Sequence, residues 1–163
     1  MLFSLPNAEE WIVPNEWHVD SPRLASGRGP DVQLFTFLDD IELRGGGALV
    51  VAGSHRLLNE GRFIKAKELR RLLRTEPFFR ELYSETPAGA EARARLMEET
   101  GAAGDVALEL EELAGSPGDA WFVDMRVLHT GAPNASARPS LMATHRFLRG
   151  DVVAELADGH GWT

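Results

Sequence analysis

The residues best suited to chemistry in this sequence begin with His18 and Asp20, in the stretch NEWHVD (15–20). Side chains two apart in a strand point to the same face, so this imidazole and carboxylate would lie together. His129 follows Asp20 by 109 residues, at the end of an apolar stretch. Two imidazoles and one carboxylate on one face of a metal leave the opposite positions open, as in non-haem Fe(II) oxygenases. An isolated His-x-Asp is more often a turn or a surface pair, so the prediction of a metal site depends on this context.

A second group of polar residues begins nine positions after His129 and opens a strand pattern. Arg138 and Ser140 would share one face of that strand. A buried guanidinium can bind a carboxylate through two parallel hydrogen bonds, and a serine hydroxyl can add a third. The plainer alternative is that Arg138 is a surface arginine at the end of a loop.

The composition is that of an acidic chain with the size of one ordinary domain. The 163 residues are 44% hydrophobic, and 17 basic against 25 acidic residues give a formal charge of −8. This charge argues against nucleic-acid and anionic-membrane partners, although one buried arginine could hold an anionic small molecule. No cysteine is present, so metal ligands must be histidine or carboxylate. Neither a signal peptide nor an apolar run of ~18 residues is recognisable, so we expect a cytoplasmic protein.

The elements that position these residues are short strands on both sides of a helical block. Residues 57–100 carry an apolar stripe from Phe63 to Leu73, and Thr86 with Pro87 has the signals of a helix start. We expect this insertion to pack on the sheet or, as a sharper alternative, to form a lid over the metal. The pattern predicts one mainly β domain (1–163), a sandwich or jelly roll. Strand patterns occupy 31–40, 45–55, 106–113, 116–130 (bent near Asp124) and 138–148.

Several separated motifs together resemble the phytanoyl-CoA dioxygenase family of Fe(II)/2-oxoglutarate oxygenases. They are WHVD (17–20), GGGALVVAGSHR (45–56) and SPGDAWFVDMRVLHTGAPNASARPSLMATHRF (116–147), in the family's order. The resemblance covers most of residues 10–150. It implies a double-stranded β-helix, which is a cupin-like jelly roll, with iron held by His18, Asp20 and His129.

The same resemblance implies how the co-substrate binds and what the reaction is. Arg138 would pair with the far carboxylate of 2-oxoglutarate, while Ser140 and Thr36 would face the same molecule. The reaction would use O₂, decarboxylate 2-oxoglutarate to succinate and hydroxylate a small-molecule substrate. A carboxylate at Asp20 favours hydroxylation, because halogenating relatives have a small residue there. The sequence departs from many members at Gly131, where they have a serine.

Two other interpretations stay open from the sequence. A cupin-like metalloprotein could use the same three ligands without 2-oxoglutarate, and a non-catalytic jelly-roll module could bind a partner. Only 17 residues precede His18, fewer than family members usually have, so we expect an exposed apolar surface that a homodimer or a partner chain covers. We expect His55 to make a structural hydrogen bond, His145 to point away from the site and His160 to lie in the tail.

Overall fold

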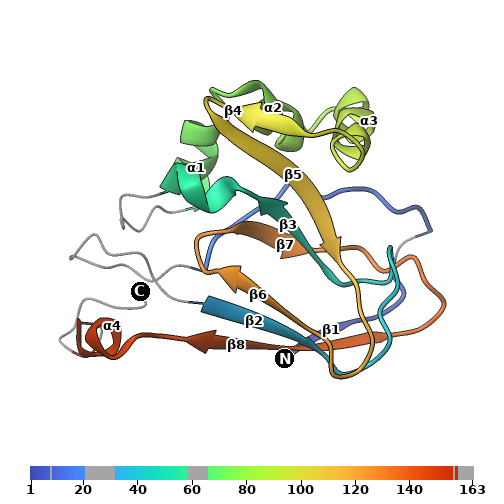
Figure 1. Cartoon of the computed structure of the whole chain (residues 1–163). Helices are drawn as coiled ribbons and strands as arrows, with labels where there is room; N and C mark the ends of the chain where they lie inside the picture. The colour runs from blue at the N-terminus through green and yellow to red at the C-terminus, as the bar shows by residue number, and fades with distance from the viewer. Residues whose placement is uncertain (8, 21–31, 59–65, 156, 158–163) are drawn as a thin grey trace.

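The computed structural model describes residues 1–7, 9–20, 32–58, 66–155 and 157 of the chain. Its strands form two antiparallel four-stranded sheets, so the prediction of a mainly β fold is confirmed (Figure 1). The first sheet has the strand order β1-β8-β2-β6, and the second sheet has the order β4-β5-β3-β7. The strands are β1 (Leu2–Ser4), β2 (Val32–Phe37), β3 (Ala48–Ala52), β4 (Gly101–Ala103), β5 (Val106–Leu113), β6 (Ala120–Asp124), β7 (Leu128–Gly131) and β8 (Ser140–Phe147).

The helices between β3 and β4 confirm the predicted helical insertion for the part of it that is described. Thr86 caps α3 as its sequence signal predicts, because its hydroxyl accepts a hydrogen bond from the Gly89 backbone N–H at 3.1 Å. Phe63 and the rest of 59–65 lie outside the described residues. The helical elements are η1 (Ser54–Leu58), α1 (Ala66–Leu73), α2 (Pro77–Leu82), α3 (Pro87–Arg95) and, after β8, α4 (Gly150–Glu155).

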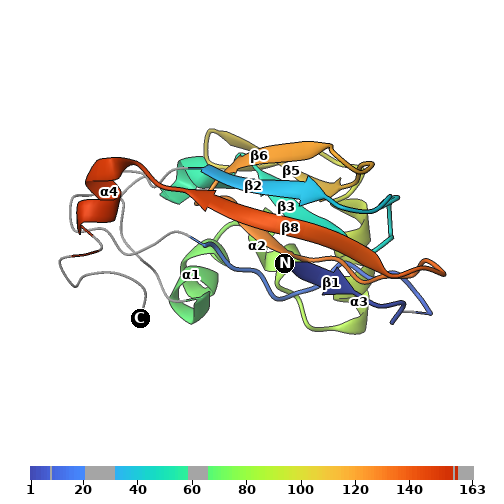
Figure 2. The ribbon, with the colours of Figure 1, turned by 90° about the horizontal axis from the view of Figure 1, so that it is seen from below.

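Two layers of buried side chains hold the elements together. One lies between the two sheets and includes Phe35 and Phe37 of β2 with Val50 of β3. The other lies on the opposite face of the second sheet, where Leu49 and Val51 of β3 pack against α1 and α2. Alternate residues of β3 therefore serve different layers, as the period of a strand requires. Seen from below, the first sheet lies in front and the three helices of the insertion lie behind (Figure 2).

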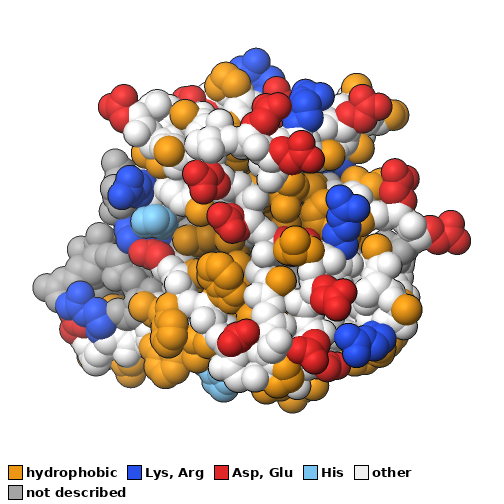
Figure 3. All heavy atoms as spheres, turned by 45° about the vertical axis from the view of Figure 1, so that its right-hand side comes forward, with side chains coloured by type: hydrophobic (Ala, Val, Ile, Leu, Met, Phe, Trp, Pro, Cys, Tyr) orange, Lys and Arg blue, Asp and Glu red, His pale blue; other side chains and the backbone are white. Residues whose placement is uncertain are grey.

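The outer face of the first sheet carries exposed hydrophobic side chains. Phe122 of β6, Phe147 of β8 and Val32 of β2 are 70%, 53% and 38% exposed. Strand register places Val32 opposite Phe147, and Leu34 opposite Phe122, so these side chains share one face. In the space-filling view, hydrophobic side chains gather along the lower edge, where the first sheet lies (Figure 3). The first sheet therefore has a partly apolar outer face among the described residues.

The turn between β6 and β7 confirms the predicted bend near Asp124. The Asp124 carbonyl accepts a hydrogen bond from the Val127 N–H at 2.9 Å, and its carboxylate accepts one from the Arg126 N–H at 2.8 Å. This turn moves the chain from the first sheet to the second and sets the start of β7, which carries His129.

The loop between β7 and β8 is held by the buried side chain of Asn134. Its amide nitrogen donates to the carbonyls of Ser4 at 3.2 Å and Arg138 at 2.9 Å, and its oxygen accepts from Ser136. Asparagine side chains commonly bond the backbone of their own turn, and Asn134 also ties this loop to the N-terminal segment. Among the described residues, no helix is long and apolar enough to cross a membrane.

Candidate metal centre

His18 and His129 come together because the segment before residue 20 pairs with β7. The backbone N–H of each histidine donates to the carbonyl of the other, at 3.0 and 2.9 Å. The two imidazole centroids are 4.4 Å apart. Antiparallel pairing of this kind brings opposite side chains close on one face, so the distant parts of the motif meet as the sequence predicted.

Asp20 completes a cluster with the two histidines. Its Oδ1 lies 3.9 Å from His18 Nε2, and its Oδ2 lies 3.5 Å from His129 Nε2. One ligand atom from each of the three residues lies within 4.8 Å of the others. Ligands about 2.1 Å from a metal at right angles would be roughly 3 Å apart, so a cation held between these side chains would draw them closer together than they lie here.

The tautomer of His129 directs one lone pair at the centre of the cluster. Its Nδ1 lies 3.0 Å from the Val127 carbonyl oxygen, which can only accept, so Nδ1 carries the hydrogen of the neutral ring. Nε2 of the neutral ring then offers a lone pair toward the Asp20 carboxylate. Two acceptors that face each other need a proton or a metal ion between them.

Asp20 stays ionised because of its neighbours. Burial alone would raise the pKa of Asp20, but a side-chain hydrogen bond with His129, made through a proton on Nε2 when no metal lies between them, and one with Arg146 outweigh burial and hold that pKa well below its usual range. The Arg146 guanidinium donates a hydrogen bond to Asp20 Oδ2 at 2.5 Å. Burial, with the nearby His129, lowers the pKa of His18 and keeps its ring in the neutral form that a metal needs.

Arg138, Ser140 and Thr36, the residues predicted to bind a co-substrate, lie apart from this cluster. Arg138 is exposed before β8, whereas Arg146, which contacts Asp20, stands near the other end of the strand. Six residues of extended strand from Ser140 to Arg146 span roughly 20 Å. The buried Ser140 hydroxyl is used within the fold, where it donates to the Gly46 carbonyl at 3.1 Å.

Thr36 lies on the outer side of the first sheet. The buried residues of β2 are Gln33, Phe35 and Phe37, and Thr36 alternates with them. Phe35 packs its ring against His129 at 5.9 Å between centroids, so the adjacent Thr36 points away from the cluster. The sequence prediction assigned Thr36 by its position on the strand and did not resolve the direction of the pleat.

Sequence reasoning missed Arg146 and Gln33, two polar residues of the first sheet on the side of the cluster. They are cross-strand partners in the β2–β8 register. Gln33 is 2% exposed, and its Oε1 has no hydrogen-bond partner among the described residues. The same alternation that pairs Arg138 with Ser140 continues to residue 146, so the period of β8 could have indicated Arg146.

The remaining histidines stand outside the cluster. His145 is exposed on β8, next to Arg146 and on the opposite face, as predicted. His55 lies in η1, but its buried Nδ1 has no hydrogen-bond partner among the described residues, so the structural hydrogen bond expected there is not found. His160 lies outside the described residues.

The chemistry of the donor set fits a divalent iron ion. Imidazole and carboxylate suit Fe(II), and three ligands on one side leave positions open for other molecules. The Val127 carbonyl accepts from Nδ1 of His129 and fixes its ring. Metal-binding histidines usually have such a hydrogen bond at the nitrogen that does not bind the metal. One competing contact is also present, because Arg146 occupies the carboxylate oxygen that faces His129.

Comparison with protein-family models gives a match over most of the chain. A family model described as Phytanoyl-CoA dioxygenase (PhyH) matches residues 3–140, which include the three residues of the cluster. No curated protein and no solved structure matches the chain.

Proposed function

Because the chain belongs to the phytanoyl-CoA dioxygenase family, we propose that it is an Fe(II)- and 2-oxoglutarate-dependent oxygenase that hydroxylates a small molecule. The observation that carries this proposal is the convergence of His18, Asp20 and His129 within 4.8 Å. When bound there, Fe(II) supplies the site at which O₂ is activated with electrons from 2-oxoglutarate. As part of this proposal, the two four-stranded sheets form the two halves of a jelly roll.

The chain's own residues hold the ligands in position. The Val127 carbonyl orients His129 through Nδ1, while the mutual backbone hydrogen bonds of His18 and His129 keep the two rings adjacent. Phe35 packs against the ring of the buried His129 and so excludes water from the side of that ring that faces the core. Rigid ligands of this kind need little reorganisation when the metal and its co-substrate bind.

Hydroxylation is the reaction that the ligand set favours. Asp20 is ionised and turned toward both histidines. A carboxylate at this position fills the place that a halide would need in a halogenating enzyme. We therefore propose a hydroxylase, with the chemical identity of the substrate left to experiment.

We propose Arg146 as a second candidate, beside Arg138, for binding a carboxylate of 2-oxoglutarate. Its guanidinium already contacts a carboxylate at the cluster, and a planar guanidinium suits such groups. Replacing Arg146 with glutamine should weaken 2-oxoglutarate binding to the Fe(II) protein by about tenfold or more, the effect of losing a charge-assisted hydrogen bond. The change Arg138→Gln should alter it by less than about twofold, because Arg138 is exposed at the far end of β8. The reverse ranking in a calorimetric titration would restore the assignment made from the sequence.

Succinate formation tests the proposed reaction without a known substrate. Many such enzymes turn over their co-substrate slowly when alone, so Fe(II), O₂ and 2-oxoglutarate should give succinate, detectable by NMR. The variant His129→Ala should abolish this signal, whereas His145→Ala, on the outward face of β8, should keep it. Succinate at the same rate from both variants would show that the cluster is not responsible.

A cupin-like metalloprotein without 2-oxoglutarate is the second candidate. The support for it is that Arg138, Ser140 and Thr36 do not meet at the cluster, so no complete co-substrate site is assembled from the residues expected to form it. This candidate predicts iron binding without succinate formation.

A further inference from the structure

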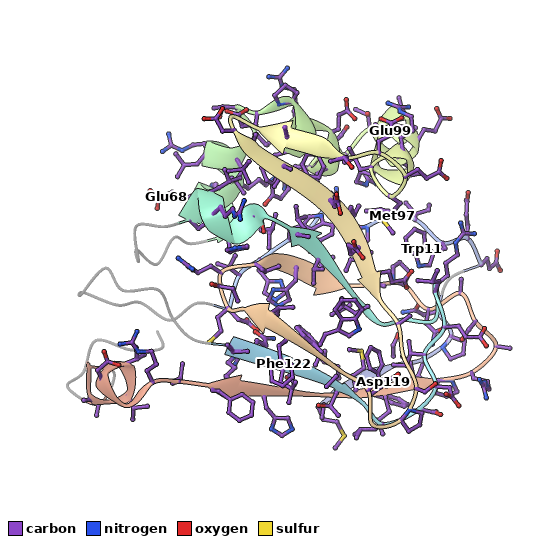
Figure 4. All side chains as sticks on the ribbon, viewed as in Figure 1. Trp11, Glu68, Met97, Glu99, Asp119 and Phe122 are labelled. Atoms are coloured by element: carbon purple, nitrogen blue, oxygen red, sulfur yellow. The ribbon has the colours of Figure 1, made fainter. Side chains whose placement is uncertain are left out.

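A pocket of about 540 Å³ opens beside the metal cluster, on its helical side. This volume lies in the range of small-molecule sites. The segment before Asp20 forms one wall, and α1 with the residue that follows α2 forms another (Figure 4 labels Glu68 on α1). The lining includes Trp17, His18, Lys67, Arg70, Tyr83 and Thr130.

Two hydrogen-bond donors in this pocket lack a partner. Tyr83 is 1% exposed, and its buried hydroxyl has no hydrogen-bond partner among the described residues. The buried Nε of Arg70 is likewise without one. A buried polar group without a hydrogen bond destabilises the folded protein, and both of these groups belong to residues that line the pocket. A ligand that reaches them would supply the missing partner.

The two side chains are fixed against each other. The Arg70 guanidinium carbon lies 5.5 Å from the centre of the Tyr83 ring, and Nη2 donates to the Tyr83 carbonyl at 3.3 Å. Nη2 also donates to the carboxylate of Glu85, which is exposed. The guanidinium is thereby held at one end, while its buried Nε makes no hydrogen bond among the described residues. Positioned donors of this kind bind a ligand with little loss of side-chain freedom.

The charges around the pocket favour an anion. Among the lining residues, Lys67 and Arg70 bring two positive charges from α1, against the exposed carboxylate of Glu16; Glu85, which is not in the lining, pairs with one end of the Arg70 guanidinium. Burial raises the pKa of the Tyr83 hydroxyl, so it stays protonated at neutral pH and can donate. A neutral donor and a guanidinium side by side match a carboxylate, which only accepts.

The pocket adjoins the cluster from outside the inter-sheet layer. Thr130 follows His129 on β7, and Trp17 precedes His18, so both side chains alternate to the helical face. His18 contributes to both the cluster and the pocket. A molecule bound in the pocket would therefore approach the metal from the helical side.

We propose that this pocket binds the carboxylate of an organic-acid substrate through Arg70, Tyr83 and Lys67, and so presents the rest of that molecule at His18. The proposal rests on the proposed oxygenase function for the meaning of "substrate", but the binding itself needs no metal. The aromatic walls of Trp17 and Tyr83 accept a short apolar chain. A neutral analogue of the same shape should bind much more weakly.

Equilibrium binding to metal-free protein tests the proposal apart from turnover. Hexanoate and its uncharged counterpart hexanamide are titrated by calorimetry, with ¹⁵N NMR to locate the site. We expect hexanoate to bind at least tenfold more tightly, with shifts at Trp17, Lys67 and Thr130. The variants Tyr83→Phe and Arg70→Gln should each weaken hexanoate by about tenfold or more.

The matched control is Arg71→Gln, which removes the same charge from an exposed position of α1 outside the pocket lining. It should change hexanoate affinity by less than about twofold. Equal binding of acid and amide, or equal affinity in Tyr83→Phe and wild type with intact NMR spectra, would overturn the proposal.

A third experiment titrates 2-oxoglutarate into the Fe(II) protein. If Tyr83→Phe weakens 2-oxoglutarate and leaves hexanoate unchanged, the pocket serves the co-substrate and the proposal is wrong.

Discussion

Replacing Arg93 by methionine should destabilise the protein and loosen the segment that carries His18 and Asp20, two of the proposed metal ligands. Arg93 of α3 is 7% exposed. Its Nε donates to the Val13 carbonyl at 2.6 Å, and a second nitrogen donates to the Ser84 carbonyl. Val13 stands five residues before His18, so this guanidinium anchors the chain just before the metal motif.

The magnitude follows from those contacts. Hydrogen bonds to charged groups contribute about 1.5–3 kcal/mol each, and burying an arginine offsets part of this. We expect the free energy of unfolding to fall by about 3 kcal/mol in Arg93→Met, which keeps much of the side-chain volume. For a domain of this size the melting temperature should fall by roughly 6–12 °C.

Urea denaturation followed by circular dichroism measures this change, and Arg95→Met is the matched control on the same helix. Within the described part of the chain, the Arg95 side chain makes an exposed ion pair with Glu81, at 4.0 Å, which should contribute little. A loss of stability in Arg93→Met that is no larger than in Arg95→Met would refute the role given to the buried guanidinium.

Two further predictions concern a buried carboxylate and the exposed face of the first sheet. Burial raises the pKa of Glu112, although the Arg44 backbone N–H, 2.9 Å from both carboxylate oxygens, opposes this. A raised folded-state pKa gives stability that is complete below the unfolded value near ~4.3 and is lost as pH rises through the folded value. The melting temperature of Glu112→Gln should therefore rise relative to that of the wild type as the pH increases from 4 to 7. A difference in melting temperature that does not change with pH would contradict this. We also propose that a second copy covers the exposed hydrophobic face around Phe122. Light scattering after size exclusion should give twice the 17.9 kDa chain mass, and Phe122→Glu should give the single mass. A wild-type monomer at high concentration would refute the dimer.

The strands and the metal cluster could be predicted from sequence because they depend on local signals. The alternation in 106–113 gave β5 with its observed bounds, and the spacing of His18 and Asp20 requires only the period of a strand. His129 could be added because it ends an apolar stretch. These signals need no knowledge of which strands are neighbours.

The co-substrate residues could not be predicted in the same way, since they depend on pleat direction and on position along β8. Thr36 and Phe35 are adjacent in sequence yet lie on opposite faces of β2. Arg138 precedes β8 and Arg146 lies near the other end of that strand, and the contact between Arg146 and Asp20 shows which end lies at the cluster. Tyr83 carried no signal of its own, because its role arises from the packing of α1 against the end of α2.

The central claim is that His18, Asp20 and His129 hold Fe(II) and that 2-oxoglutarate binds to that iron. Anaerobic titration of the purified protein with Fe(II) and then 2-oxoglutarate tests it, through the weak visible charge-transfer band of a keto acid chelated to iron. The account predicts a band that saturates at one equivalent of iron and is lost in His129→Ala but kept in His145→Ala. Iron binding without the band would contradict the use of 2-oxoglutarate, and the absence of iron binding would contradict the metal centre itself.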